Sequence, residues 1–298
     1  MPHLALVVLM AVFVASCSGR ASTPTSPTST SSTPSTTTAA ALPSCRTWAG
    51  QQRGSGVSAA LDPAQRQAFY DAGGGIRAVG GKYYGAWFPT TYGSGSGQRL
   101  LVGLHGTGGS PETEWATDWG VELPARGWAY LGLKYVDVAT GVHDDDTTIY
   151  AQIKAMVEQV RLACGFGSPS MFLVGFSRGS AESFPVAYLD LHDRRLFSAI
   201  GNNSGAWAPG QPMVPTLEAI VSRGDTAAFR GSRFWMYCGE RDMQNGFPMC
   251  DGMQAARTFV AAQGATILGF FRDPTGAHGG LNRNATALAQ MFAAFEGL

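Results

Sequence analysis

Short apolar runs alternate with longer amphipathic segments through most of this chain, and this alternation limits the possible fold more than any other feature. Apolar residues dominate the runs at 127–137, 170–177, 197–204, 232–240 and 266–273. Helical spacing of apolar residues marks the segments at 147–165, 181–192, 215–224 and 253–264. Strands that are apolar on both sides and alternate with helices are typical of a parallel sheet covered on both faces. The sequence therefore predicts an α/β fold with a mainly parallel central sheet and helices on both faces.

An antiparallel element is expected at the start of this sheet. Residues 82–92, "KYYGAWFPTTY", have the aromatic content of a strand, and the "SGSG" that follows separates them from an apolar run at 98–106. The sequence predicts a hairpin here, followed by a buried strand. Farther along, the segment at 207–232 has the length and pattern of roughly one helix, so no large lid is expected.

The N-terminus has the pattern of an export signal. Apolar residues run from Leu4 to Ala15, about a dozen positions, whereas a membrane-spanning helix needs about 20. The run ends in "VASC", which resembles a bacterial lipobox, the site where a diacylglycerol is attached to cysteine. Residues 1–17 are therefore predicted to be a signal peptide, with Cys17 as the lipidated mature N-terminus. No Lys or Arg precedes the run, so an ordinary secretory signal is the alternative.

The chain after the signal divides into a tether and one domain. Residues 18–44 are rich in Ser, Thr and Pro and contain no aromatic residue, so they cannot bury enough surface to offset the entropy of ordering. Residues 45–298 are predicted to form a single catalytic domain. Lys+Arg and Asp+Glu both number 21, and this balance favours neither a nucleic acid nor an anionic membrane as partner. Any membrane contact is expected only through the lipid anchor.

Four cysteines of the predicted domain form an even set. Export to an oxidising compartment favours disulfides, and four cysteines allow three pairings. Cys238 ends a predicted strand and Cys250 closes the loop that follows it, so we expect these two to pair and Cys45 to pair with Cys164. Four reduced, buried thiols are the alternative. The spacing lacks the close pairs of a zinc site, so no metal is expected.

The segment "GFSRG", Gly175 to Gly179, has the pattern of an activated serine. It follows a predicted strand and precedes a predicted helix, and a sharp strand-to-helix turn needs small residues on either side of the serine. Such a turn lifts the Ser177 hydroxyl above the edge of the sheet. The alternative is an ordinary turn, since the chain contains 39 glycines.

A serine nucleophile needs a general base and an orienting acid. His278 lies in "DPTGAHGG", a loop directly after the last predicted strand, from which a base can reach Ser177. His192 lies at the end of the helix that begins near Ser177 and is expected on the surface. For the acid, "YCGERDM" offers Asp242, which a short turn carries past the end of its strand. The alternatives for the acid are Glu240 and Asp273.

A glycine-rich loop is expected to hold the oxyanion of the tetrahedral intermediate. The segment "LHGTGGS" follows the buried strand at 98–106. The backbone N–H of Thr107, or of its neighbour Gly108, would supply one hydrogen bond, and that of Arg178 the other. His105 is expected to brace this loop. A phosphate-binding loop is less favoured, because the complete P-loop and dinucleotide patterns are absent.

The segments "LHGTGGS", "GFSRG", "GERD" and "GAHGG", in this order, resemble the α/β-hydrolase superfamily. The appearance is closest to the secreted feruloyl esterases and polyhydroxybutyrate depolymerases, although Arg178 and Ser180 depart from the small residues usual there. The resemblance implies a serine esterase that needs no metal or organic cofactor and acts on a small or polymeric ester. The alternatives are a serine peptidase on the same fold and a catalytically silent surface-binding lipoprotein.

Overall fold

A computed structural model of the protein describes residues 44–51, 63–93, 97–137, 140–206, 215–244 and 246–298. The predicted signal peptide with Cys17, and all but the last residue of the predicted tether, lie outside these residues. Among the helices that the structure describes, none is long and apolar enough to cross a lipid bilayer.

The described domain is built on an eight-stranded sheet with the strand order β1-β2-β4-β3-β5-β6-β7-β10. Strand β2 runs antiparallel to both of its neighbours. The strands β4-β3-β5-β6-β7-β10, in their order across the sheet, are parallel to one another. The predicted α/β fold with a mainly parallel sheet is therefore confirmed. The strands are β1 (Gly75–Val79), β2 (Lys82–Trp87), β3 (Arg99–Leu104), β4 (Ala129–Lys134), β5 (Ser170–Phe176), β6 (Phe197–Asn203), β7 (Arg233–Gly239) and β10 (Thr266–Asp273). A separate two-stranded hairpin joins β8 (Met243–Gln244) to β9 (Phe247–Pro248).

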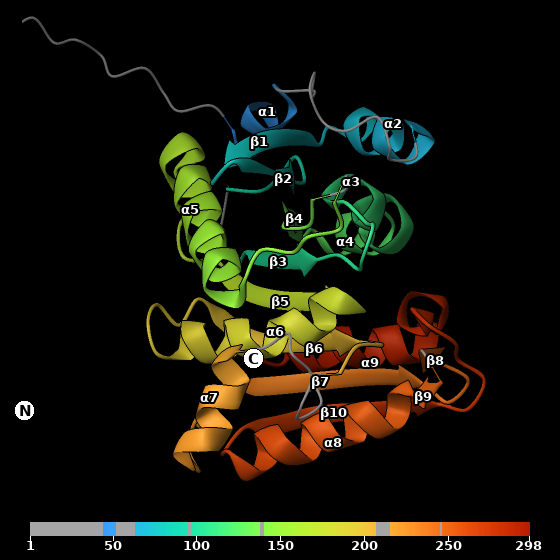
Figure 1. The fold of residues 1–298 in the computed structure, drawn as a ribbon. Helices are drawn as coiled ribbons and strands as arrows, with labels where there is room; N and C mark the ends of the chain where they lie inside the picture. The colour runs from blue at the N-terminus through green and yellow to red at the C-terminus, as the bar shows by residue number, and fades with distance from the viewer. Residues whose placement is uncertain (1–43, 52–62, 94–96, 138–139, 207–214, 245) are drawn as a thin grey trace, which may run out of the picture. The chain divides into compact units, whose positions relative to one another are not determined.

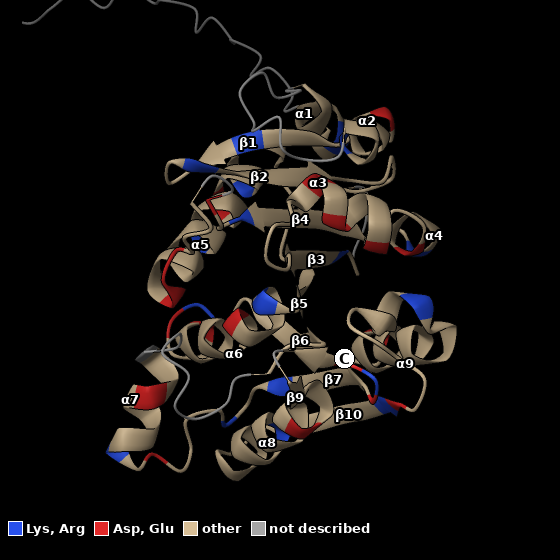
Figure 2. Ribbon diagram, turned by 45° about the vertical axis from the view of Figure 1, so that its right-hand side comes forward, with Lys and Arg blue, Asp and Glu red and all other residues tan. Residues whose placement is uncertain are grey.

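Helices cover both faces of the sheet, as Figures 1 and 2 show. Their buried apolar residues form two separate clusters, one on each face. The first cluster is covered by α1 (Cys45–Gly50), α5 (Asp146–Cys164), α6 (Arg178–Leu191), α7 (Pro215–Arg223) and α8 (Met249–Ala262). The second is covered by α2 (Pro63–Asp71), the π-helical turn η1 (Trp115–Trp119) that continues α3 (Pro111–Glu114), α4 (Glu122–Arg126), the 3-10 turn η2 (Gly280–Arg283) and α9 (Ala285–Glu296).

The start of the sheet differs from the prediction. The strand expected at 82–92 ends at Trp87, and its hairpin partner is β1, a strand that was not predicted from the sequence. Gly80 and Gly81 form the two-residue turn between them, with φ angles of 52° and 77°. A turn with two positive φ angles matches the twist of a hairpin and strongly favours glycine. The pair "GG" directly before residue 82 was the signal for this hairpin.

Two disulfides join helices to the rest of the domain. Cys45 in α1 is bonded to Cys164 at the end of α5, and Cys238 in β7 is bonded to Cys250 in α8. This is the pairing that we expected from the sequence. The second bond lies beside the loop that carries Asp242.

Candidate active site

Ser177 occupies a sharp turn between β5 and α6. Its φ and ψ angles are 53° and −114°, a backbone conformation that is unusual for a residue with a side chain. The two flanking glycines are required by close packing. A Cβ atom on Gly175 would lie 2.1 Å from the carbonyl oxygen of Gly179, and one on Gly179 would lie 1.8 Å from that of Leu104. The turn therefore has the conformation that the "GFSRG" pattern predicts.

Three side chains from different loops meet in one chain of hydrogen bonds. His278 Nε2 lies 2.8 Å from Ser177 Oγ, and His278 Nδ1 lies 2.8 Å from Asp242 Oδ2. An ionised Asp242 accepts the proton of Nδ1, which leaves Nε2 as the acceptor for the serine hydroxyl. The Asp242 side chain is fully buried, whereas that of His278 is 31% exposed. The structure thus brings together the serine, histidine and aspartate expected from the sequence.

The loop after β7 holds Asp242 in place. Gly239, at the end of β7, accepts a hydrogen bond from the Asp242 backbone N–H at 3.1 Å, which closes a tight turn. Gly239 also packs against the histidine loop, because a Cβ there would lie 2.3 Å from the Gly276 carbonyl oxygen. The second carboxylate oxygen of Asp242 accepts a hydrogen bond from Gln244 at 2.9 Å. Both carboxylate oxygens are therefore occupied, and the carboxylate is fixed toward His278.

Two alternative site residues lie on the surface. Glu240 forms a two-point ion pair with Arg272, with distances of 2.7 and 3.0 Å. The hydrogen bonds from Arg272 lower the pKa of the Glu240 carboxyl. His192 is exposed at the end of α6, where Nδ1 contacts the backbone oxygen of Tyr188 at 2.8 Å. Neither residue forms a hydrogen bond with Ser177 or His278.

Asp273, the other alternative acid, shapes the loop that carries His278. Its Oδ2 accepts hydrogen bonds from Asn284 at 2.7 Å and Tyr237 at 2.9 Å, and its Oδ1 accepts the Gly276 backbone N–H at 2.9 Å. The hydrogen bond from Asn284, together with those from Thr275 and Tyr237, lowers the pKa of Asp273 to about 2. Asp273 therefore positions the histidine loop rather than contacting the histidine ring.

His105 braces the loop that follows β3. The side chain is buried, stacks on Tyr135 with ring centroids 4.8 Å apart, and places Nδ1 2.7 Å from the Gly106 carbonyl oxygen. Burial lowers the pKa of His105 to about 3, so the ring is neutral at physiological pH. Lys134 donates a hydrogen bond to the Gly109 carbonyl in the same loop. These contacts fit the bracing role expected from the sequence.

The expected oxyanion residues lie next to the serine. A Cβ atom on Gly106 would lie 3.2 Å from the Cβ of Ser177, so this loop passes directly beside the turn. Thr107 follows Gly106 and lines the cavity beside His278. Gly108 has a φ of 76°, which favours glycine. Arg178 is the first residue of α6.

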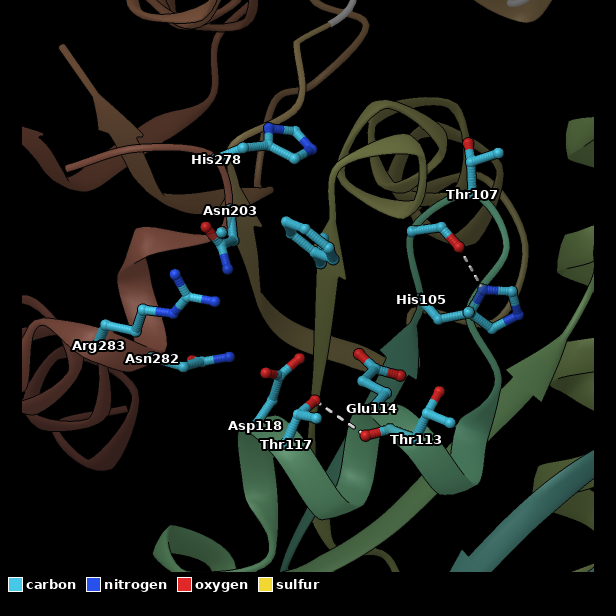
Figure 3. Close-up of a pocket in the computed structure, with 14 residues that line it drawn as sticks. His105, Thr107, Thr113, Glu114, Thr117, Asp118, Asn203, His278, Asn282 and Arg283 are labelled. Atoms are coloured by element: carbon cyan, nitrogen blue, oxygen red, sulfur yellow. Dashed lines mark hydrogen bonds between the residues drawn. The ribbon is translucent and has the colours of Figure 1, made fainter. Parts of the chain in front are cut away.

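A cavity of about 280 Å³ opens beside His278. Figure 3 shows His278 and Thr107 at one end, and Glu114 and Asp118 at the other. The far end is built by α3, η1 and η2, which the sequence pattern did not predict. Its polar residues are Thr113, Glu114, Thr117, Asp118, Asn282 and Arg283. They come from two segments far apart in the chain, and neither segment carries a recognisable site pattern.

Glu114 is buried in the wall of this cavity. The Tyr130 hydroxyl lies 2.8 Å from Glu114 Oε2 and 3.0 Å from the Pro111 carbonyl oxygen, so one hydroxyl proton faces two acceptors. A proton on Glu114 resolves this, because Glu114 then donates to Tyr130 and Tyr130 donates to Pro111. Burial, with the charge of Asp118, raises the pKa of Glu114 to about 8. The geometry and the pKa both indicate a neutral carboxylic acid at pH 7.

If Glu114 is protonated in the folded protein, the free energy of unfolding should depend on pH. The folded protein keeps the Glu114 proton up to about pH 8, whereas the unfolded chain releases it near 4.5. Between these values the folded state binds more protons, so this group stabilises the fold fully below pH 4.5 and loses that effect as pH rises toward 8. Glu114→Gln is expected to weaken the decline in unfolding free energy between pH 5 and 8. Denaturant titrations at several pH values measure this.

The control for that experiment is Glu218→Gln, on the exposed side of α7. This variant is expected to retain the pH dependence of the wild type. If Glu114→Gln also follows the wild-type curve, Glu114 is ionised in the folded protein.

Removing the Cys238–Cys250 bond is expected to affect both stability and activity. It closes 12 residues around the Asp242 loop, so a double Cys→Ala variant is expected to lose about 3 kcal/mol of stability in the chain-entropy model. Its kcat is expected to fall as well, because α8, which follows the loop of Asp242, loses its covalent tie to β7. Removing the Cys45–Cys164 bond, which closes 119 residues, is the matched control. That control is expected to lose about 5 kcal/mol but to keep its kcat while folded. Equal effects of both variants on kcat would contradict the role assigned to Cys238–Cys250.

Comparison with known proteins shows the fold. No family model and no curated protein matches the chain. Among solved structures, a proposed dienelactone hydrolase from Klebsiella pneumoniae is similar at a TM-score of 0.54 and 14% identity, covering 76% of this chain and 98% of its own. One of two fungal esterases from Rhizomucor miehei has a TM-score of 0.53 at 14% identity, over 75% and 81% of the two chains. Esterase B from Lactobacillus rhamnosis has 0.52 at 15%, over 75% and 85%. The chain therefore has the α/β-hydrolase fold, and identities this low show the fold alone.

Among the described residues, no group of three or more His, Cys, Asp or Glu side chains is arranged to hold a metal ion. The groups gathered beside Ser177 are a serine in a strained turn, a histidine, and a buried carboxylate behind the histidine, an arrangement that can activate a serine as a nucleophile.

Proposed function

We propose that this protein is a serine hydrolase of carboxylic esters. The observation that carries the proposal is the continuous hydrogen-bonded set Ser177, His278 and Asp242, built on the strained turn between β5 and α6. A serine hydroxyl is a weak nucleophile at neutral pH and becomes effective when an adjacent base can accept its proton. The esterases among the similar folds support ester hydrolysis as the reaction class.

In the proposed mechanism, Ser177 Oγ attacks the ester carbonyl carbon while its proton passes to His278 Nε2. The tetrahedral intermediate collapses, the bond to the alcohol oxygen breaks, and His278 returns the proton to the leaving alcohol. Water then attacks the acyl-enzyme with His278 again as base, which releases the acid and restores the Ser177 hydroxyl. Asp242 keeps the proton on Nδ1 and stabilises the imidazolium that forms in each step.

The proposed oxyanion donors are the backbone N–H of Thr107, or of Gly108, and the backbone N–H of Arg178. The position of the Gly106 loop against Ser177 supports this assignment. The Arg178 side chain is engaged in an ion pair with Glu182 at 2.7 Å. The backbone of Arg178, at the start of α6, is therefore the part expected to act on the substrate.

A panel of substrates tests the proposal. Purified domain is expected to hydrolyse short p-nitrophenyl esters and to leave peptide anilides intact. Cleavage of the anilides alone would identify a peptidase, the second reading of this fold. No turnover of either substrate, together with no labelling by an organophosphonate, would identify a catalytically silent binding protein.

The finer specificity proposed is that of secreted feruloyl esterases and polyhydroxybutyrate depolymerases, which act on bulky or polymeric esters. Exposed apolar side chains support a bulky substrate. Met243 and Phe247 lie on the hairpin directly after Asp242, and they are 53% and 47% exposed. Feruloyl and hydroxybutyrate polymer substrates in the same panel test this specificity.

We propose that the protein is exported and anchored through a lipid on Cys17, with residues 18–44 as the tether. Two disulfides in the domain are compatible with an extracellular location. Cys17→Ser is expected to move the protein from the membrane fraction to the soluble fraction, because two acyl chains supply the anchor. Detergent-phase partitioning measures this. Equal partitioning of wild type and variant would show an ordinary secretory signal instead.

A further inference from the structure

Arginines gather at the edge of the sheet where the parallel strands begin. Lys+Arg and Asp+Glu are equal in number over the whole chain, but they are unevenly distributed over the domain. Exposed arginines lie near the end of α5, after the ends of α6 and α7, and at the start of β7. We call this surface the basic edge, and its arginines are Arg161, Arg194, Arg195, Arg223, Arg230 and Arg233.

The basic edge is one continuous surface. Arg161 and Arg194 line the same shallow pocket between α5 and the end of α6. Arg195 donates a hydrogen bond to the Leu191 carbonyl at 3.1 Å. Leu191 in turn lies beside the segment before β7, because a Cβ atom on Gly231 would lie 3.7 Å from it. The arginines after α6 therefore adjoin those before and at the start of β7.

Positive charge is in excess here because the nearby carboxylates are engaged. Glu158 is paired with an arginine of this edge at 2.7 Å, and Asp193 is paired with Lys154 at 2.6 Å. Asp225 accepts a backbone N–H at 2.9 Å, and Glu218 lies in the first turn of α7, away from the edge. Among the described residues, four of the six arginines form no ion pair within 4.0 Å: Arg195, Arg223, Arg230 and Arg233.

Exposed apolar side chains accompany these arginines. Leu162 follows Arg161 and is 62% exposed, and Val221 is 49% exposed in the last turn of α7, close to Arg223. The surface of an anionic bilayer suits both kinds of side chain, because its phosphates attract arginine and its acyl boundary accepts apolar groups. A soluble polyanion would leave the apolar side chains in water.

The first described residues of the chain lie at the same edge. Helix α5 ends at Cys164, shortly before β5 begins at Ser170, and Cys45 is bonded to Cys164. Parallel strands begin at one edge of a sheet and end at the other, so Cys45 lies at the edge where they begin. Residues 1–43, which include the predicted lipid anchor, therefore join the domain at the basic edge.

The catalytic residues lie at the opposite edge of the sheet. Ser177, Asp242 and His278 follow the carboxyl ends of β5, β7 and β10. Figure 1 shows this separation along β7, with α7 near one end of the strand and the β8–β9 hairpin near the other. A surface that binds the basic edge therefore leaves Ser177 open to solvent.

We propose that the basic edge binds the surface of an anionic phospholipid bilayer, with the catalytic residues facing away from the lipid. This contact adds to the membrane attachment through Cys17 and does not require it. It orients the domain, which an anchor at the far end of a Ser/Thr/Pro-rich tether cannot do.

Vesicle sedimentation tests the inference with residues 18–298, produced without the signal peptide and the lipid. Vesicles of phosphatidylcholine with about 30% phosphatidylglycerol are compared with vesicles of phosphatidylcholine alone. Binding to the anionic vesicles is expected to be at least tenfold tighter at about 0.1 M salt, and to disappear at about 1 M salt, where charges are screened beyond about 3 Å. Equal binding to the two kinds of vesicle would overturn the inference.

Variants locate the contact. An arginine near an anionic bilayer strengthens binding about fivefold, so Arg223→Gln combined with Arg230→Gln is expected to weaken binding at least tenfold. The matched control is Arg241→Gln combined with Arg272→Gln, which removes two exposed arginines at the opposite edge and is expected to bind like the wild type. Unchanged binding in the folded Arg223 and Arg230 variant, or an equal loss in the control, would contradict the proposed contact.

Two further measurements test the partner and the orientation. Excess DNA duplex is expected to leave the protein on the anionic vesicles, and its release by DNA would identify a soluble polyanion as the partner instead. Turnover of a soluble p-nitrophenyl ester is expected to be the same for vesicle-bound and free protein, whereas its loss on binding would place the catalytic edge against the lipid. Sedimentation needs no turnover, so it decides the bilayer contact even if the protein hydrolyses no ester.

Discussion

Alanine in place of Ser177 is expected to abolish covalent labelling by an organophosphonate and to lower kcat for p-nitrophenyl esters by roughly 10⁵- to 10⁶-fold, the scale seen when a serine nucleophile is removed. The reason is that only Ser177 has its hydroxyl 2.8 Å from an imidazole nitrogen among the described residues. Mass spectrometry of the labelled protein and stopped assays with the esters measure the two effects.

The control variant is Ser222→Ala, an exposed serine on α7 whose hydroxyl donates only to the Ala219 carbonyl. It is expected to keep full labelling and activity. Circular dichroism must show that Ser177→Ala is folded. Folding is expected, because alanine carries the same Cβ atom as serine and the strained φ angle at residue 177 costs it no more. Labelling that persists in folded Ser177→Ala would assign the nucleophile to another residue.

Much of the fold could be predicted because its signals are local. Each parallel strand is a short, nearly continuous apolar run, and each covering helix shows helical spacing, as in α5, where Ile149, Ile153 and Met156 are all buried. The region at 111–126 could not be predicted in the same way. Its helices are four or five residues long and one turn is π-helical, so no periodic pattern develops.

Some residues of the candidate site also have a local sequence signal, whereas others do not. Ser177 and its glycines lie within five positions, and the turn they need is encoded in those positions. His278 and Asp242 follow strand ends, and the carboxyl ends of parallel strands meet at one edge of the sheet. Asp118 and Asn282 have no such signal. They reach one cavity because η1 and η2 pack on the same face of the sheet, which is a property of the tertiary structure.

Asparagine in place of Asp242 is expected to lower kcat about 10⁴-fold while the protein stays folded, as when the orienting carboxylate of a triad is neutralised. The carboxylate accepts the Nδ1 proton of His278 at 2.8 Å and a Gln244 hydrogen bond at 2.9 Å. An amide nitrogen facing Nδ1 would donate instead, so the ring would carry its proton on Nε2 and could not accept one from Ser177. Burial adds to the loss, because the Asp242 side chain is fully buried and no water can replace the missing acceptor.

The matched control is Glu240→Gln, two residues away in the same loop. Glu240 pairs with Arg272 on the surface and forms no hydrogen bond with Ser177 or His278, so kcat is expected to change less than about threefold. Steady-state kinetics of both variants with one p-nitrophenyl ester decide between the two carboxylates. A large loss in Glu240→Gln with little change in Asp242→Asn would reverse the assignment. The present geometry argues against that result, because Glu240 would first have to leave Arg272 and turn inward to reach Nδ1 of His278.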